Sequence, residues 1–218
     1  MATNFRYPTG ARPLLIEETA RRRGIEPRFV ALHEDAGSAE VVLPIIDFAE
    51  PYAGVAERDA AKQSYRFTDR DGELVAIRSD FTPMVARALA PSLNGASQAL
   101  RVFYRGDVIR CQSSRLGANR ELFQIGAELV GDPSADADVA MLRLAAAIAS
   151  TFTAQPLVVH TGAPDLDDPT FVMHDDPDDD RGYYTGLPFW VYGDDRRTPI
   201  AQGGRYDSLS ARFRADVA

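Results

Sequence analysis

The sequence is poor in cysteine and in long apolar runs. Its 218 residues include one cysteine, Cys111, which cannot form an intrachain disulfide or a thiolate metal cluster. No apolar run approaches the roughly 20 residues that a membrane span needs, and residues 1–6 lack the apolar core of a secretory signal. We therefore expect a cytoplasmic protein without a membrane partner or a structural zinc site.

Basic charge is also in deficit. Lys and Arg number 24 against 32 Asp and Glu, and the net charge of -8 repels phosphate backbones. The histidines, His33, His160 and His174, are dispersed along the chain. The sequence thus predicts no nucleic-acid partner, no metal site and no cofactor.

The remaining composition is typical of a folded protein. With 45% hydrophobic and 26% charged residues, the chain falls outside the disordered, collagenous and coiled-coil classes. A length of 218 residues suits one substantial core. We expect residues 1–218 to form a single domain.

The N-terminal region predicts a helix and an unusual strand. A helical pattern over residues 12–23 opens at Pro13 and is expected to stop at Gly24. The β-branched run 41–46 is interrupted by Pro44, whose missing N–H excludes a central strand. This run therefore fits an edge or interface strand.

Two hairpins and two helices are predicted next. The runs 64–67 and 74–78 flank an Asp-Gly turn, which is strong hairpin chemistry. A short helix over 84–89 follows, with Thr82 as its expected N-cap. A longer hairpin joins 100–110 to 121–130, and Ser134 then introduces a long apolar helix that we expect to be buried against a sheet.

The C-terminal third predicts strands around an acidic loop. Residues 163–181 form the acidic connection, which lacks the spacing of a calcium loop. The other predicted elements are strands at 157–160, 183–192 and 198–201 and a helix at 205–213 opened by Gly203 and Gly204. Hairpins with inserted helices favour an α+β class with a mainly antiparallel sheet.

Two arginine-bearing segments could carry chemistry. The segment 78–83 contains an Arg, an Asp and a Thr that could clamp an amino group, or that could form an N-cap with a nearby ion pair. Arg105, presented from a sheet, suits a bidentate grip on a carboxylate or phosphate, whereas a surface ion pair is individually more common.

A strand in the second hairpin offers further polar groups. Gln124 and Glu128 are four residues apart and so share a face, and the small Gly126 between them would leave room for a ligand. Buried Gln and Glu need partners, which could be an ammonium group, an imidazole N–H or a protein group. Tyr183 and Tyr184 add two phenols.

Together these motifs resemble the histidyl-tRNA synthetase-like branch of the class II synthetase family over about residues 7–207. The resemblance rests on the order Arg-Ser-Asp-Phe-Thr-Pro (78–83), Phe-Tyr-Arg-Gly-Asp (103–107), Arg-Glu-Leu-Phe-Gln-Ile-Gly-Ala-Glu (120–128), Tyr-Tyr-Thr-Gly (183–186) and Gly-Gly-Arg-Tyr-Asp (203–207). It implies a class II aminoacyl-tRNA synthetase-like antiparallel sheet flanked by helices.

The resemblance also implies a ligand site and a dimer. Arg105 would meet ATP and the amino-acid carboxylate, and the region around Pro44 looks like a dimer motif, which implies a homodimer. The residues that would surround the ammonium group and side chain of histidine are Asp80, Thr82, Gln124 and Glu128, with Tyr183 and Tyr184 lining the imidazole pocket.

Departures from the family pattern decide between its members. Only 11 residues follow Asp207 up to Ala218, which leaves no counterpart for the glycine-rich strand and helix with the second ATP-binding arginine. Asp107 stands where the synthetases usually carry Glu, and the residues between Arg181 and Tyr183 are fewer than usual. The anticodon-binding and inserted domains are also expected to be absent.

These departures predict lost catalysis. The first hypothesis is a non-catalytic paralogue that resembles the regulatory subunit of ATP phosphoribosyltransferase, the first enzyme of histidine biosynthesis. The resemblance implies that it is required by a short catalytic subunit and senses histidine. Residues Asp80, Thr82, Arg105, Gln124, Glu128 and Tyr184 would hold that histidine. The alternatives are a histidine-adenylating ligase without a tRNA-binding domain and a dimerisation module without a ligand.

Overall fold

The computed structural model describes residues 7–53, 64–93, 99–111, 119–153, 155–162, 171–173, 184–193 and 199–213. The helices in these ranges are α1 (Ile16–Asp35), α3 (Thr82–Leu89), α4 (Ala135–Ser150) and α5 (Leu209–Arg212), with 3-10 turns η1 (Glu50–Tyr52) and η2 (Ala90–Leu93). The strands are β1 (Ala39–Glu40), β2 (Ile46–Phe48), β3 (Arg66–Thr68), β4 (Leu74–Ile77), β5 (Leu100–Ile109), β6 (Glu121–Val130), β7 (Val158–Thr161), β8 (Phe171–Met173), β9 (Pro188–Tyr192) and β10 (Ala201–Gly204).

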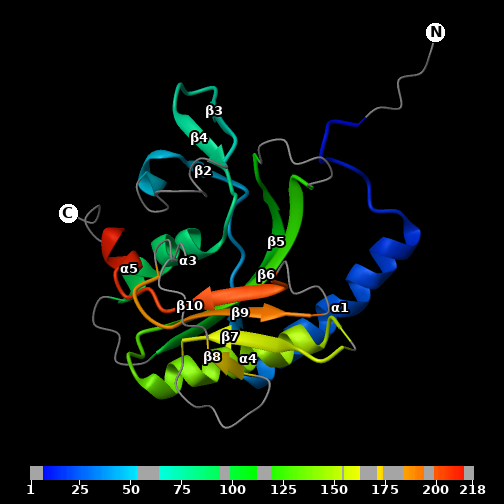
Figure 1. The fold of residues 1–218 in the computed structure, drawn as a ribbon. Coiled ribbons are helices and arrows are strands. Elements are labelled where there is room, and N and C mark those ends of the chain that lie inside the picture. Colours follow the sequence, from blue (N-terminus) through cyan, green and yellow to red (C-terminus); the bar gives the residue numbers. More distant parts are fainter. Residues whose placement is uncertain are drawn as a thin grey trace.

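The strands form three sheets, which Figure 1 shows flanked by the helices. Their orders are β1-β5-β6, β10-β9-β7-β8 and β2-β4-β3. Neighbouring strands are antiparallel except for the parallel pairs β1 with β5 and β7 with β8. The predicted α+β class with an antiparallel-rich sheet is confirmed, as are both predicted hairpins.

The hairpin β5–β6 lies between α1 and α3, so its two faces have different neighbours. Side chains alternate across a strand, and directly paired residues of an antiparallel ladder share a face. The pair Tyr104–Gly126 lies on the face toward α3, which we call the α3 face. Phe103 and its partner Ala127 lie on the opposite side, the α1 face, where Phe103 contacts Phe29 of α1.

The helix α1 is longer than its sequence signals suggest. It runs through Gly24 and Pro27 to Asp35, so the prediction that it ends at Gly24 is wrong. Phe29 and His33 are fully buried, and the His33 ring stacks on Phe103 at 5.0 Å between centroids. Because most helical stability comes from packing of a buried face, this contact outweighs the local glycine and proline signals.

The predicted strand at residues 41–46 is also wrong. β1 ends at Glu40 and β2 begins at Ile46. Backbone hydrogen bonds hold the two ends of the connection, from Val41 N–H to the Phe103 carbonyl oxygen and from Arg78 N–H to the Ile45 carbonyl oxygen, both at 2.9 Å. Arg78 donates from Nη1 to the carbonyl oxygen of Leu43 at 2.8 Å. Pro44 is exposed in this connection. Arg78 therefore anchors an irregular segment where the sequence predicts an edge strand.

At the start of α3, Thr82 is not the N-cap. The helix begins at Thr82 itself, and Phe81 occupies the N-cap position without a side-chain cap. The Thr82 hydroxyl instead donates to Glu128 on β6 at 2.8 Å. By contrast, the predicted start of α4 is confirmed, since Ser134 caps it by accepting from the N–H of Ala137 at 3.2 Å.

Two C-terminal expectations need correction. Residues 171–173 of the predicted acidic connection form β8, which pairs with β7; the rest of residues 163–181 lies outside the described ranges. Gly203 and Gly204 belong to β10 and open no helix. A Cβ on Gly203 would lie 2.5 Å from the Phe189 ring, so close strand packing explains the glycine.

A pair of glycine substitutions tests the continuous helix. Gly24→Ala meets no atom within 4 Å in a helical backbone and is expected to raise the free energy of unfolding by about 0.5–1 kcal/mol. Gly37→Ala, just beyond α1 at a φ of 73°, is expected to lower it by about 1 kcal/mol. Denaturant unfolding measures both, and a destabilising Gly24→Ala would contradict a helix that passes through residue 24.

Candidate functional site on the α3 face of the hairpin

Glu128 lies on the α3 face of β6 among hydroxyl groups from three other segments. Its Oε1 accepts from Thr82 Oγ1 of α3 at 2.8 Å and from the Tyr104 hydroxyl of β5 at 3.2 Å. Its Oε2 accepts from the hydroxyl of Tyr206, in the segment that precedes α5. The Glu128 residue is 8% exposed. These hydrogen bonds satisfy a carboxyl group that burial would otherwise penalise heavily.

Gly126 makes this arrangement possible. Tyr104 lies directly opposite Gly126 in the ladder, and a Cβ on Gly126 would lie 2.6 Å from Cζ of the tyrosine ring. The expectation that Gly126 leaves room for a ligand is therefore wrong, because the Tyr104 ring occupies that space. The glycine instead lets the Tyr104 hydroxyl reach Glu128.

Burial changes the acidity of Glu128. Removal from water raises the pKa of Glu128 to about 8, and the nearby Asp80 carboxylate adds to this rise. The hydrogen bonds from Thr82 and Tyr104 act in the opposite direction because they stabilise the anion. No cationic side chain in the described ranges pairs with Glu128. The group therefore carries a proton at neutral pH.

Asp80 and Gln124 form a second polar group beside Glu128. Gln124 donates from Nε2 to Asp80 Oδ1 at 3.0 Å, and the same oxygen accepts from the N–H of Phe81. The other amide atom, Gln124 Oε1, is buried and accepts no hydrogen bond from the described residues. The pairing with Asp80 fixes the amide orientation. The site thus holds an acceptor that an N–H group of a ligand would satisfy.

Arg110, which sequence reasoning missed, contributes a positive charge next to this group. Its Nε donates to the carbonyl oxygen of Ser79, the residue before Asp80, at 2.9 Å. No further partner of this guanidinium lies within the described ranges. Because its terminal nitrogens form a planar fork, Arg110 can bind a carboxylate beside the Asp80 carboxylate.

Arg105 does not join the predicted site. Its ladder partner is Ile125, so it lies on the α1 face, away from Gln124 and Glu128. There Arg105 donates from Nη1 to Glu26 at 3.1 Å and from Nε to Glu40 at 2.9 Å. The alternation of side chains along a strand predicts this difference. Residue 110 is an even number of positions from Tyr104 and so continues its face, whereas residue 105 is one position away and lies on the opposite face.

The tyrosines predicted to line the site lie in the segments after β8. Tyr183 lies outside the described residues. The ring of Tyr184 is 6.4 Å from the ring of Tyr206, which places Tyr184 beside the hydroxyl cluster of Glu128. A Cβ on Gly204 would lie 2.8 Å from the Tyr184 ring, so this glycine allows the tyrosine to pack there.

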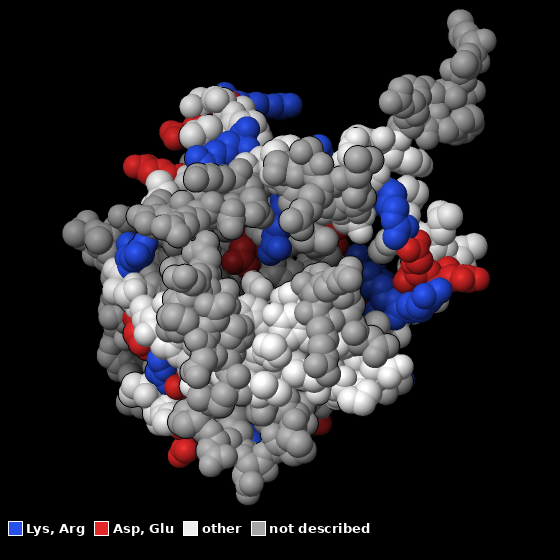
Figure 2. Space-filling view, in the orientation of Figure 1, with Lys and Arg blue, Asp and Glu red and all other residues white. Residues whose placement is uncertain are grey.

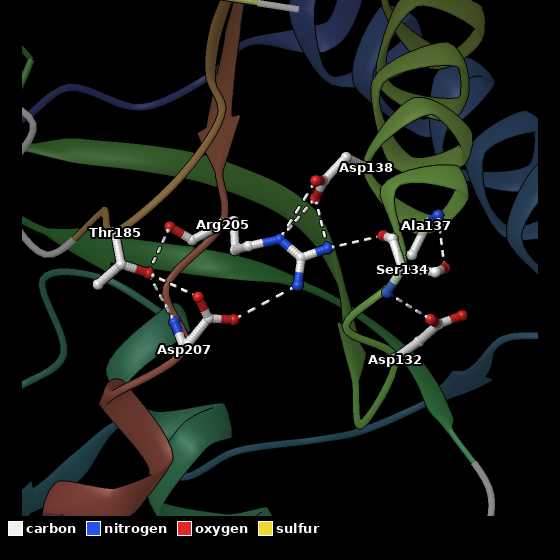
Figure 3. A network of polar contacts seen from close by, with 7 residues as sticks. All are labelled: Asp132, Ser134, Ala137, Asp138, Thr185, Arg205 and Asp207. Carbon is white, nitrogen blue, oxygen red and sulfur yellow. Dashed lines mark hydrogen bonds and ion pairs between the residues drawn. The ribbon is translucent and has the colours of Figure 1, made fainter.

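Arg205 ties the segment that carries Tyr206 to α4. It donates to the Asp138 carboxylate and, through Nη2, to the carbonyl oxygen of Ser134 at 2.8 Å. Figure 3 shows Arg205 between these groups and Asp207, which in turn bonds Thr185. Hydrogen bonds and ion pairs therefore fix the segment from which Tyr206 reaches Glu128.

Arg78, the first residue of the 78–83 motif, has a structural role. Its Nε donates to the carbonyl oxygen of Asp107 at 2.7 Å, and its guanidinium lies over the Phe81 ring. A Cβ on Gly106 would lie 2.7 Å from Arg78 Nη2 and 3.1 Å from the Phe81 ring, so the glycine leaves room for the arginine to pass over β5 at this point. Arg78 therefore joins the 41–45 connection to the hairpin.

Figure 2 shows a hollow near the middle of the face of the molecule in view, with basic and acidic atoms deep within it. Within the described residues, no group of His, Cys, Asp and Glu is placed to hold a metal ion. No helix in these ranges is long and apolar enough to cross a membrane.

The arrangement of antiparallel-rich sheets and flanking helices is a class II synthetase-like fold. Solved structures share it with TM-scores of 0.78 and 0.77. They are an ATP phosphoribosyltransferase regulatory subunit/histidyl-tRNA synthetase from Bacillus halodurans, at 20% identity over 98% of this chain and 79% of that one, and an S. aureus histidyl-tRNA synthetase, at 23% identity over 96% and 64%.

The chain belongs to the histidyl-tRNA synthetase family, whose sequence model matches residues 10–175 and 168–218. Curated relatives carry two names. The ATP phosphoribosyltransferase regulatory subunit of Symbiobacterium thermophilum is 36% identical over 69% of this chain and 39% of the relative. The histidine–tRNA ligase of Methanocaldococcus jannaschii is 32% identical over 66% and 35%. The match with these two relatives thus spans less than half of their length.

The buried carboxyl group makes stability depend on pH. Folding raises the pKa of Glu128 from its ordinary value of about 4.5 to about 8, so the folded state binds more protons between these values and loses stability as pH rises. Between pH 5 and 8, wild type is expected to lose about 3 kcal/mol of unfolding free energy relative to Glu128→Gln. Urea unfolding at each pH measures the difference, in which other titrating groups cancel. Parallel curves would contradict a buried, protonated Glu128.

Proposed function

We propose that this site binds free histidine. An α-amino acid carries an ammonium group one carbon away from a carboxylate, and the site offers matching charges at adjacent positions. The ammonium group would lie between Asp80 and the unpaired Oε1 of Gln124, and Arg110 would bind the carboxylate. This juxtaposition of Asp80, Gln124 and Arg110 on one face is the observation that carries the proposal.

The side chain of the bound amino acid would then lie toward Glu128. Asp80 and Thr82 are two residues apart, and each contacts β6, at Gln124 and at Glu128 respectively. A ligand anchored at Asp80 thus has the hydroxyl-lined carboxyl group within its reach. An imidazole ring provides both an N–H donor and an acceptor nitrogen for such a group, with Tyr184 beside it.

We further propose that the chain is the synthetase-like part of a regulatory subunit of ATP phosphoribosyltransferase. It would be non-catalytic, would be required by a short catalytic subunit and would report the histidine concentration to the assembly. Several relatives bear this name. Adenylation needs cations on the phosphates, and Arg105 and Arg205 both pair with acidic residues of this chain, so neither is free for that role.

A histidine-adenylating ligase is the second candidate. Relatives named histidine–tRNA ligase support it. Histidine-dependent exchange of pyrophosphate into ATP separates the two functions, because only the ligase forms an adenylate. We expect no exchange with the purified chain at saturating histidine.

The proposed assembly also includes a homodimer formed through the sheet β2-β4-β3. Ile46, Phe48 and Phe67 share one face of this sheet by their register and are 49%, 47% and 41% exposed. Exposed Pro44 immediately precedes the sheet. A cluster of large apolar side chains on a small sheet is typical of an interaction surface.

A matched pair of arginine variants tests the ligand site. Arg110→Met is expected to weaken histidine binding about 10- to 100-fold, because it removes a charged partner of the carboxylate. Arg105→Met removes the same charge from the α1 face and should leave the affinity unchanged. Isothermal titration measures both. The reverse order would place the ligand on the α1 face, and absence of histidine binding by wild type would contradict the proposed site.

Charge introduced into the apolar face tests the dimer. Phe48→Glu is expected to raise the dimer dissociation constant at least tenfold, since a carboxylate would be buried without a partner. Leu74→Glu is the control, because Leu74 is 51% exposed on the opposite face of the same sheet. Sedimentation velocity measures the dissociation constants. Equal effects of both variants would contradict an interface restricted to the Phe48 face.

A further inference from the structure

The N-terminal segment forms a turn at residues 8–11. Ala11 donates from its N–H to the carbonyl oxygen of Pro8 at 3.0 Å, and Gly10 has a φ of 79°. This φ lies in the left-handed region that the third residue of a type II turn adopts, where glycine is favoured. Gly10 therefore fixes the direction in which the turn presents its backbone groups.

The turn meets the end of the hairpin β5–β6, and Figure 1 shows the N-terminal segment beside that end. The carbonyl oxygen of Gly10 accepts from the N–H of Arg120, the residue before β6, at 2.7 Å. The carbonyl oxygen of Arg120 accepts in turn from the N–H of Arg110, the residue after β5, at 2.9 Å. Gly10 thus lies two hydrogen bonds away from the backbone of Arg110.

A second segment holds Arg110 from the other side. The N–H of Ile109 donates to the carbonyl oxygen of Arg78 at 2.9 Å. The side chain of Arg110 donates from Nε to the carbonyl oxygen of Ser79, also at 2.9 Å. The end of the hairpin therefore lies between two backbone supports, of which the turn 8–11 is one.

The turn is itself anchored to the start of α1. Arg12, directly after the turn, donates through both terminal nitrogens to the Glu18 carboxylate, at 2.8 and 2.6 Å. An exposed ion pair adds little stability, but its two parallel hydrogen bonds restrict how the chain leaves the helix. The turn is thus held between α1 and the hairpin.

We propose that the turn 8–11 is a positioning element for Arg110. The carbonyl oxygen of Gly10 holds the end of the hairpin so that the guanidinium fork of Arg110 is aligned with the carboxylate of the bound amino acid. This inference rests on the proposed binding of histidine and gives a role to residues outside the ligand site. A bidentate contact depends on orientation, so a small displacement of the hairpin end lowers the affinity although Arg110 is still present.

A pair of glycine variants of the full chain tests the turn. Gly10→Val is expected to distort it, because a β-branched residue is strained at a φ of 79°. Gly72→Val is the control, since Gly72 has a φ of 88° in the turn between β3 and β4, where a Cβ meets no atom within 4 Å. Isothermal titration should show that Gly10→Val weakens histidine binding about 2- to 10-fold and that Gly72→Val leaves it unchanged.

Histidinol separates positioning from general damage to the fold. This analogue has an alcohol in place of the carboxylate and so forms no ion pair with Arg110. Gly10→Val should therefore bind histidinol as tightly as wild type does. It should also cause no further loss of histidine affinity when it is combined with Arg110→Met, because its effect passes through Arg110.

The outcomes separate this inference from the proposed function. Weaker binding of histidine alone by Gly10→Val supports the positioning role. An equal loss for histidine and histidinol, a further loss in the Arg110→Met background, or an unchanged histidine affinity of Gly10→Val each overturns it while histidine binding stands. Absence of histidine binding by wild type overturns both.

Discussion

The alternation of side chains across the hairpin β5–β6 is the constraint on which the rest of the structure depends. Because each strand presents successive residues to opposite sides, one hairpin supports two different environments. Toward α1 it presents Phe103 and Arg105, which fix the long helix by ring stacking on His33 and by ion pairs. Toward α3 it presents the polar residues of the candidate site, Gln124 and Glu128. A shift of one residue in register would exchange the two sets.

The candidate site is built around a carboxyl group that is expensive to bury as an anion. The protein compensates with hydroxyl donors from three separate segments, which is why Glu128 also joins β6 to β5, α3 and the segment before α5. Gly126 serves the same purpose, since it admits the Tyr104 ring. The hydrogen-bond network around Glu128 makes this part of the site rigid, and ligand binding there can influence every element that the network joins.

Local patterns predicted much of this fold, and the failures have a common physical cause. Alternation and turn chemistry were sufficient for both hairpins and for the shared face of Gln124 and Glu128. Packing that is distant in sequence decided the rest: Phe103 sustains α1 beyond Gly24. Tyr206 reaches Glu128 from 78 positions away, which no local pattern reveals. The place of Arg110 in the site was predictable in principle, because alternation along the strand puts residue 110 on the same face as Tyr104 and residue 105 on the opposite face.

A crystal structure of the chain with histidine tests the central claim most directly. The account predicts the ligand on the α3 face, with its carboxylate on Arg110, its ammonium group at Asp80 and Gln124, and its ring at Glu128. Histidine bound beside Arg105 on the α1 face, or in the reverse orientation with its ammonium group on Glu128, would contradict it.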